Sequence, residues 1–402
     1  MTQSARGVEP FIGKQNLFEV GDNPDFDLYH IPGIVVTAKG TVLAWCEARH
    51  GGGDWSDIRV LLRRSEDDGK SWSPPESIVE VADPKPKNPF ALRLKNVNTS
   101  HVTYNNPVLI ADRDGTVHMV FCLEYMRAFY QKSEDDGRSW SEPVEITEAF
   151  NQFKKDYPWK VLATGPNHSI QLQNGRLLIP VWLSTGEGGN AHRPSVTSTI
   201  YSDDGGKTWQ AGEIAVPNTE EWINPNETVA VELSDGRVML NVRNESKKHR
   251  RLVTISEDGI SGWSTPTFDE SLLEPICMGG LVRYDHGDEN LLLFSNPHNL
   301  DGARKGKAEP GKSRQRKNLS VKISSDEGNS WATSKVLEPG PSMYSDIAVT
   351  HDGTILCFYG TGKKPGFAGD ALTLARFNLE WLQSPDKAAS SSEDESSGSL
   401  NP

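Results

Sequence analysis

The chain has 402 residues, of which 36% are hydrophobic and 24% are charged, an ordinary composition for a protein that folds around its own core. No apolar run approaches the roughly 18 residues that a membrane-spanning helix needs. The net charge of -13 at pH 7 disfavours binding to nucleic acid or to an anionic membrane. We therefore expect a small molecule or a glycan as the ligand, with the oligomeric state left open.

The N-terminal segment MTQSARGVEPFIG lacks the apolar core of about 7 to 15 residues that marks a secretory signal. As it stands, the chain is expected to be cytoplasmic; if a leader has been removed, it would be secreted or periplasmic. Its cysteines form no C-x-x-C pair and lie near no histidine at metal-binding spacing. We expect no metal or cofactor, and we expect four buried small hydrophobic side chains at Cys46, Cys122, Cys277 and Cys357.

An eight-residue pattern, S-x-D-x-G-x-x-W, recurs along the chain. In this pattern Asp accepts bonds from backbone amides, Gly supplies a positive φ, and Trp packs its ring between strands. Each copy therefore predicts a tight turn, an Asp-box turn, between two strands. The copies are SEDDGKSW from Ser65, SEDDGRSW from Ser133, SDDGGKTW from Ser202, SSDEGNSW from Ser324, and the worn SEDGISGW from Ser256, with Ile260 in place of the glycine.

Short segments rich in Val, Ile, Leu and aromatic residues lie between these turns, whereas convincing amphipathic helices are scarce. The predicted strands lie in 58–65, 116–125, 176–184, 237–244, 290–297, 319–325 and 354–360. Intervals of 68, 69, 54 and 68 residues between the repeats suit units of four antiparallel strands. The sequence thus predicts an all-β protein, a six-bladed β-propeller of four-stranded blades within 1–383. The Ser- and acid-rich segment 384–402 is predicted to be a disordered tail.

One segment stands outside the repeats. Residues 301–317 carry seven Lys or Arg against two acids. The segment fits two interpretations: a solvated surface loop, or a flap that offers cations to an anionic substrate.

Polar residues placed where strands reach the centre of such a fold are the candidates for chemistry, because the Asp-box turns lie on the rim. They occur in the motifs HIPG, EARHGGGDWSD, NETVAVELSDG, NVRN, RKNL and YSD. The candidates are His30, Glu47, Arg49, Asp54, Asp57, Glu227, Arg243, Arg316 and Tyr344.

The order of these motifs, with the Asp-box turns between them, resembles that of the sialidases (neuraminidases) from about residue 28 to 376. The resemblance implies Tyr344 as the nucleophile and Glu227 as its base. It implies Asp54 as the acid/base, with Asp57 as the second candidate. Arg243 and Arg316 match two of the three arginines that hold the sugar carboxylate. Arg49 would contact the hydroxyl side of the sugar ring, oriented by Glu47.

The residue types suit the reaction that the resemblance implies, exo-acting hydrolysis that releases a terminal sialic acid or a related acidic sugar with retention. The reacting carbon carries a carboxylate, so a carboxylate nucleophile would be repelled, whereas a neutral phenol is not. Arginine binds a carboxylate through two parallel bonds and stays charged at working pH.

Two positions depart from the sialidase pattern. The family has R-I-P at the first strand and L-Y-E at the last, but this chain has His30 and Gly360 there. A bond to a charged group is worth roughly 1.5 to 3 kcal/mol, so the missing arginine predicts weaker carboxylate binding or a different acidic sugar.

Three functions remain open at this stage. The first is the hydrolase, which predicts that the Tyr344 hydroxyl bonds Glu227. The second is a lyase acting on uronate-containing polysaccharide, which predicts His30 rather than Glu227 beside Tyr344. The third is a glycan-binding propeller without turnover.

Overall fold

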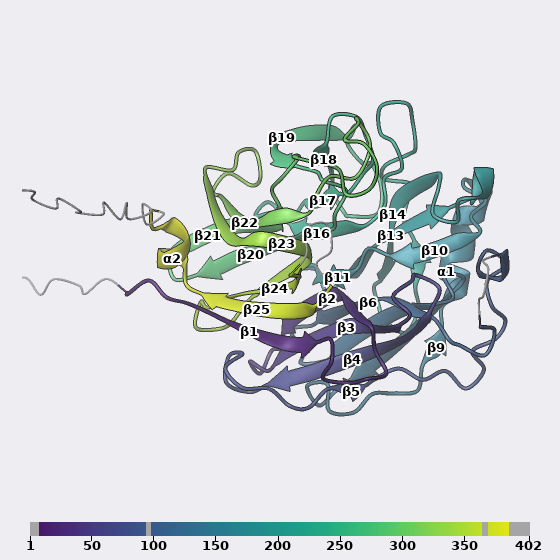
Figure 1. The fold of residues 1–402 in the computed structure, drawn as a ribbon, viewed down its shortest axis with the longest axis horizontal. Coiled ribbons are helices and arrows are strands. Elements are labelled where there is room, and N and C mark those ends of the chain that lie inside the picture. Colours follow the sequence, from purple (N-terminus) through teal and green to yellow (C-terminus); the bar gives the residue numbers. More distant parts are fainter. Residues whose placement is uncertain (1–7, 94–97, 364–368, 386–402) are drawn as a thin grey trace, which may run out of the picture.

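The computed structural model describes residues 8–93, 98–363 and 369–385, and most of its regular elements are β-strands (Figure 1). The all-β prediction is confirmed. Apart from its first two residues, the predicted tail 384–402 lies outside the described ranges. None of the helices within those ranges is long and apolar enough to cross a membrane.

The strands form antiparallel meanders that follow one another along the chain. The first sheet has the order β2 (Leu28–Val36), β3 (Val42–His50), β4 (Asp57–Ser65), β5 (Glu76–Ser77). The second has the order β11 (Asn167–His168), β6 (Tyr104–Ala111), β7 (Val117–Leu123), β8 (Arg127–Ser133), β9 (Val144–Glu145), in which β11 runs parallel to β6.

The third sheet has the order β10 (Val161–Thr164), β13 (Leu177–Ser184), β14 (Ser195–Ser202), β15 (Gln210–Ala211), and β12 (Ile170–Gln171) also pairs with β13. The fourth has the order β16 (Thr228–Glu232), β17 (Val238–Val242), β18 (Arg250–Ser256), β19 (Thr267–Leu273). The short helices are α1 (Thr147–Asn151), α2 (Leu379–Gln383) and the single-turn η1 (Ala91–Arg93), η2 (Gln152–Lys155) and η3 (Glu187–Gly189).

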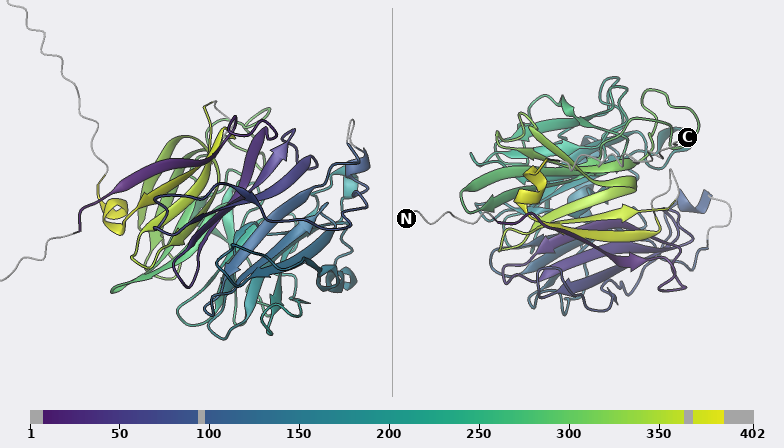
Figure 2. Two further views of the ribbon diagram at one scale, coloured as in Figure 1. Left: turned by 90° about the horizontal axis from the view of Figure 1, so that it is seen from below. Right: turned by 60° about the vertical axis from the view of Figure 1, so that its left-hand side comes forward.

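The fifth sheet has seven strands rather than the predicted four. Its order is β1 (Ile12–Glu19), β25 (Ala371–Phe377), β24 (Ile355–Thr361), β23 (Thr333–Val349), β22 (Lys317–Ser324), β21 (Glu289–Pro297), β20 (Gly280–His286). The long strand β23 joins two groups, because its first part pairs with β22 and its second part, from Ser342, pairs with β24. Figure 2 shows the N-terminal strand β1 beside the C-terminal strand β25, with which it pairs antiparallel.

All five repeats form the predicted turns, each between a long strand and the next strand of the same sheet. In every copy the serine Oγ donates to the aspartate Oδ1 at 2.7–2.9 Å. The worn copy from Ser256 keeps this bond although Ile260 replaces the glycine. The tryptophans of the repeats are only partly exposed or buried and pack against separate apolar clusters. The repeat therefore fixes the turns, as the pattern predicts.

Buried apolar side chains form six clusters, each between consecutive groups of strands. One cluster lies between the two groups that β23 joins. Another packs strands β1, β24 and β25 against β2, β3 and β4, so the last strands of the chain lie against the first. The cysteines are confirmed as buried residues, and each belongs to one of these clusters.

Strand β2, at one edge of the first sheet, carries a bulge that sets the direction of His30. The pairing with β3 shifts between His30 and Gly33, and Ile31 has φ +55°. Such a bulge changes the direction of a side chain and leaves one residue of the strand without a partner in the neighbouring strand. Gly33 faces the indole of Trp45, which is fully buried, and a Cβ at this glycine would overlap the ring.

We expect Gly33→Ala to lower the free energy of unfolding by about 1 to 3 kcal/mol, because the buried Trp45 ring has no room to move away. Denaturant unfolding measures the change. Gly13→Ala is the matched control: no atom lies within 4 Å of a Cβ there. Equal stability of Gly33→Ala and the unmodified protein would show that the glycine is not required for packing.

Candidate active site

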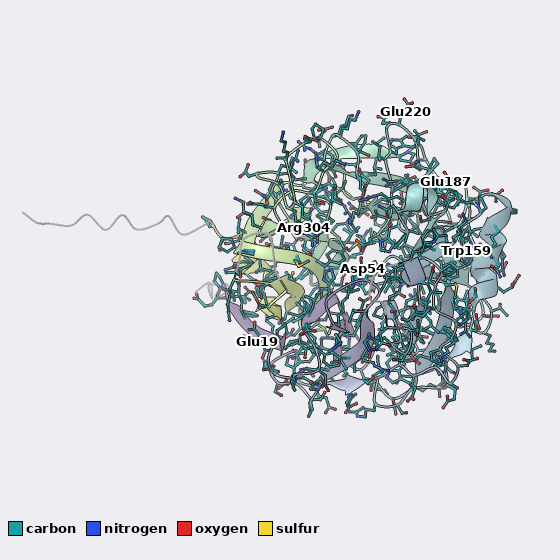
Figure 3. The ribbon with its side chains drawn as sticks, turned by 45° about the vertical axis from the view of Figure 1, so that its right-hand side comes forward. Glu19, Asp54, Trp159, Glu187, Glu220 and Arg304 are labelled. Carbon is teal, nitrogen blue, oxygen red and sulfur yellow. The ribbon has the colours of Figure 1, made fainter. Side chains whose placement is uncertain are left out.

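A cavity of about 510 Å³ opens where the ends of strands from several sheets meet. Its lining includes seven of the predicted site residues: His30, Arg49, Asp54, Glu227, Arg243, Arg316 and Tyr344. Figure 3 labels Asp54, one of these lining residues. Residues up to 314 positions apart in the sequence therefore share one site.

Tyr344 and Glu227 form the centre of the site. The Tyr344 hydroxyl lies 2.7 Å from both carboxylate oxygens of Glu227, and Tyr344 is only 5% exposed. The pairing of β23 with β24 shifts between Ser342 and Ser345, and this irregularity sets the direction of the Tyr344 side chain. A phenol is thus held against a carboxylate that can accept its proton.

Arg243 lies directly opposite Glu227, because the backbone of the two segments continues the pairing of β16 with β17. The Arg243 amide donates to the Glu227 carbonyl at 3.0 Å, and the Asn226 amide donates to the Arg243 carbonyl at 3.0 Å. The guanidinium forms an ion pair with the Glu227 carboxylate and donates to the Tyr344 hydroxyl at 3.1 Å. Glu227 therefore contacts both the phenol and a cation.

The pKa of Tyr344 is raised well above its usual value. Burial is the main cause and the Glu227 carboxylate adds to it, while Arg243 and Arg316 act in the opposite direction. The phenol is therefore protonated at neutral pH, and it becomes nucleophilic only if a neighbouring base takes its proton. Glu227 is the base within reach.

Arg316 lies just before β22 and covers the ring of Tyr344. Its guanidinium carbon is 5.4 Å from the ring centroid, and its terminal nitrogen donates to the Ile276 carbonyl. The Arg316 Nε is buried and has no hydrogen-bond partner among the described residues. A cation with spare donors thus faces the same space as Arg243.

Arg49, on β3, connects a buried carboxylate to an exposed one. Its Nε donates to Glu47 at 2.8 Å, and one terminal nitrogen donates to Asp54 at 2.8 Å. Glu47 is fully buried behind Arg49 and does not line the cavity, whereas half of the Asp54 side chain is exposed in the loop before β4. Burial by the surrounding protein raises the pKa of Asp54, but the positive charge of Arg49 lowers it more. The pKa of Asp54 therefore lies well below its usual range.

His30 packs against the Tyr344 ring at a tilt of 53° without taking the place of Glu227. The two ring centroids are 4.4 Å apart, and the hydroxyl bonds Glu227. Burial, Arg49 and Arg316 hold the pKa of His30 well below its usual value, against a smaller opposing effect of Asp54. The imidazole is therefore neutral at pH 7 and supplies no third positive charge. Asp57, the second candidate for acid/base, begins β4 beside Arg59 and lies outside the cavity lining.

Two features of the cavity escaped sequence reasoning, and a third was one of two interpretations that the sequence left open. One wall is aromatic: Tyr125 lies 5.1 Å and Trp182 lies 5.4 Å from the ring centroid of His192. Arg193 and Glu245 form an ion pair on the rim. Arg304 and Lys305 line the cavity, which favours the flap interpretation of 301–317. Only this last feature had a signal in the sequence, the excess of basic residues.

Curated relatives match along most of this chain. A sialidase of Micromonospora viridifaciens is 28% identical over 392 residues, which cover 94% of this chain and 55% of that protein. A sialidase of Bacteroides fragilis is 28% identical over 388 residues, which cover 89% and 64%. Human sialidase-3 is 25% identical over 393 residues, which cover 84% and 86%. The chain thus spans less than two thirds of the length of the first two.

Solved structures share the fold at lower identity. A Hadza microbial sialidase has a TM-score of 0.71 at 23% identity, covering 92% of this chain and 69% of that one. The intramolecular trans-sialidase of Ruminococcus gnavus has a TM-score of 0.72 at 17% identity, covering 92% and 98%. Trypanosoma rangeli sialidase with 2,3-difluorosialic acid, a covalent intermediate, has a TM-score of 0.67 at 18% identity, covering 94% and 60%.

The family described as BNR repeat-like domain matches residues 88–357, which include four of the five Asp-box turns and the segments that carry Glu227, Arg243, Arg316 and Tyr344. The match covers more than half of the chain. The chain therefore belongs to the BNR repeat-like domain family.

Proposed function

We propose that this chain is a glycosidase of the sialidase type, which releases a terminal carboxylate-bearing sugar from a glycan with retention of configuration. The observation that carries the proposal is the contact of the Tyr344 hydroxyl with both oxygens of Glu227 at 2.7 Å, in a cavity that also holds Arg243 and Arg316. The sialidases among the relatives support the reaction class.

In the proposed first step, the Tyr344 oxygen attacks the anomeric carbon while Glu227 takes the phenolic proton. In the reactive form Asp54 is protonated, a minor form at neutral pH because Arg49 lowers the pKa of this carboxyl. Asp54 gives that proton to the glycosidic oxygen, the bond to that oxygen breaks, and the glycan leaves as an alcohol. In the second step, Asp54 takes a proton from water as the water oxygen attacks the same carbon. The bond to Tyr344 breaks, and the phenolate recovers its proton from Glu227. Two inversions give net retention.

The charges of the site fit these steps. The sugar carboxylate would lie between Arg243 and Arg316, whose guanidinium groups can donate to it in pairs. Both cations also oppose the rise in the pKa of Tyr344, so they favour the phenolate that forms as the proton moves to Glu227.

We propose further that the sheets form the six blades of a propeller. The two groups of strands joined by β23 would be two blades, and the other four sheets would be one blade each. The six apolar clusters, the last of which joins the final strands to the first sheet, support a closed ring.

The test compares three substrates: a fluorogenic sialoside, a uronate-containing polysaccharide and a neutral glycan. Release of the fluorophore, with the retained anomer as the first sugar product by NMR, is the expected result. An unsaturated product absorbing in the ultraviolet would instead indicate the lyase. Binding without any turnover would indicate a glycan-binding propeller. The bond from Tyr344 to Glu227 rather than His30 favours the hydrolase.

A further inference from the structure

Arginines around the cavity differ in how their charge is balanced. Three of them are paired with carboxylates: Arg49 with Glu47 and Asp54, Arg193 with Glu245, and Arg243 with Glu227. Within 8–93, 98–363 and 369–385, Arg304 and Arg316 have no carboxylate partner, and the Arg304 guanidinium has no hydrogen-bond partner either. Two arginines without a carboxylate partner therefore face one cavity.

The backbone of the 301–317 segment holds Arg304 at this place. The Arg304 amide donates to the Ser313 carbonyl at 3.1 Å, and a bridge pairs Ala303 with Arg314. The Asn299 side chain donates to the backbone carbonyl of Gln315 at 2.7 Å. These bonds hold the two sides of the segment together close to Arg316, which lies just before β22, so Arg304 lies near Arg316.

Arg304 lines the cavity and is less exposed than the lysines that follow it in the segment. Arg304 is only partly exposed, while Lys305 and Lys307 are exposed. Repulsion by Arg316, followed by burial, lowers the pKa of Arg304 to about 10, and Tyr344 acts in the opposite direction. Arg304 therefore stays charged at neutral pH, and it lies close enough to Arg316 and Tyr344 for both to affect its pKa. Figure 3 labels Arg304 and Asp54, which both line the cavity.

Holding two like charges together costs free energy unless an anion lies between them. His30, at the position where the resemblance to sialidases implies an arginine, is neutral and cannot supply a third cation. We propose that Arg304, from the segment between β21 and β22, is the third arginine that binds the substrate carboxylate, together with Arg243 and Arg316. This inference rests on the proposed function, since it assumes a carboxylate-bearing sugar.

The alternative is that Arg304 is a surface charge that the ligand never contacts. The two possibilities differ in how binding depends on the ligand's own charge. A contact to the carboxylate is lost when the carboxylate is esterified, whereas a contact to hydroxyl groups or a general effect on the loop is not.

The experiment titrates N-acetylneuraminic acid, 2-keto-3-deoxynononic acid and their methyl esters into the full chain by calorimetry. We expect Arg304→Ala to weaken binding of the acids about ten- to a hundredfold and to change binding of the esters less than about twofold. Arg304→Lys, which keeps the charge but not the planar fork, is expected to lie between the two. Lys307→Ala, a cation of the same segment outside the cavity lining, is the matched control and is expected to bind like the unmodified protein.

Unchanged binding of the acids by Arg304→Ala, or an equal loss for acids and esters, overturns the role of Arg304 while leaving the proposed function intact. If the unmodified protein binds neither acid, the proposed function fails and the role of Arg304 fails with it. Thermal unfolding of each variant checks that the fold is kept, and Arg304→Gln provides a second uncharged variant.

Discussion

Tyr344→Phe is expected to lower kcat on a sialoside by at least about 10³-fold, because it removes the atom that attacks the sugar. The ring keeps its packing against His30 and Arg316, and Glu227 keeps its ion pair with Arg243. The fold and the binding of the sugar carboxylate should therefore survive. Initial rates at saturating substrate measure the loss, and calorimetry with the free sugar measures binding.

Two further variants make this result specific. Glu227→Gln keeps the side-chain volume but cannot take the phenolic proton, so we expect a fall of about 10²- to 10⁴-fold. Tyr201→Phe is the matched control, because it also removes a phenolic hydroxyl, one that bonds Gln210 on β15. If Tyr344→Phe retained more than about a tenth of the activity, another group would have to be the nucleophile.

Arg49→Met is expected to lower the free energy of unfolding by about 3 to 5 kcal/mol, because Glu47 is fully buried and loses its cation. Burial already raises the pKa of Glu47, against the lowering by Arg49, and the variant raises it further. A raised pKa in the folded state means that the folded protein binds protons more tightly. The loss of free energy of unfolding in Arg49→Met should thus be smallest below about pH 4.3, the usual pKa of glutamate. It should grow as the pH rises above that value.

Glu47→Gln in the Arg49→Met background removes the unpaired charge and should restore most of the lost stability. Urea unfolding at pH 5 and pH 8 measures both effects. If Arg49→Met costs less than about 1 kcal/mol at pH 8, or if the double variant is no more stable than the single one, the buried pair does not have the assigned role.

The same double variant reports on Asp54. Since Arg49 lowers the pKa of Asp54, its removal raises that pKa, and more of the general acid is protonated at a given pH. The limb of the kcat/KM profile on which Asp54 loses its proton should move to higher pH. An unmoved profile would mean that Asp54 is not the acid, and Asp54→Asn would then be expected to stay active.

The repeats made much of the fold predictable. The Asp-box pattern sets a local turn through side chains a few residues apart, so it can be recognised without knowing the rest of the structure. The strand segments were recognisable for the same reason. Sheet membership was harder, since β1 pairs with β25 more than 350 residues away and β23 runs on through two groups of strands.

Site residues that belong to recognisable motifs could be predicted from the sequence. Those whose position depends on irregular backbone could not. Tyr344, Glu227 and Arg243 were named from their motifs, and they meet in the cavity. By contrast, the direction of His30 depends on a bulge in β2, and the place of Arg304 depends on bonds across a long loop. Neither has a periodic pattern, because bulges and loops follow long-range contacts rather than local preference.

The most direct test of the proposed mechanism is covalent labelling of Tyr344. The protein is incubated with 2,3-difluorosialic acid and, separately, with its 2-keto-3-deoxynononic acid counterpart, and intact and peptide masses are measured. The mechanism predicts one sugar per chain on the peptide that contains Tyr344, with none in Tyr344→Phe. No label from either compound, or the same label in Tyr344→Phe, would contradict it.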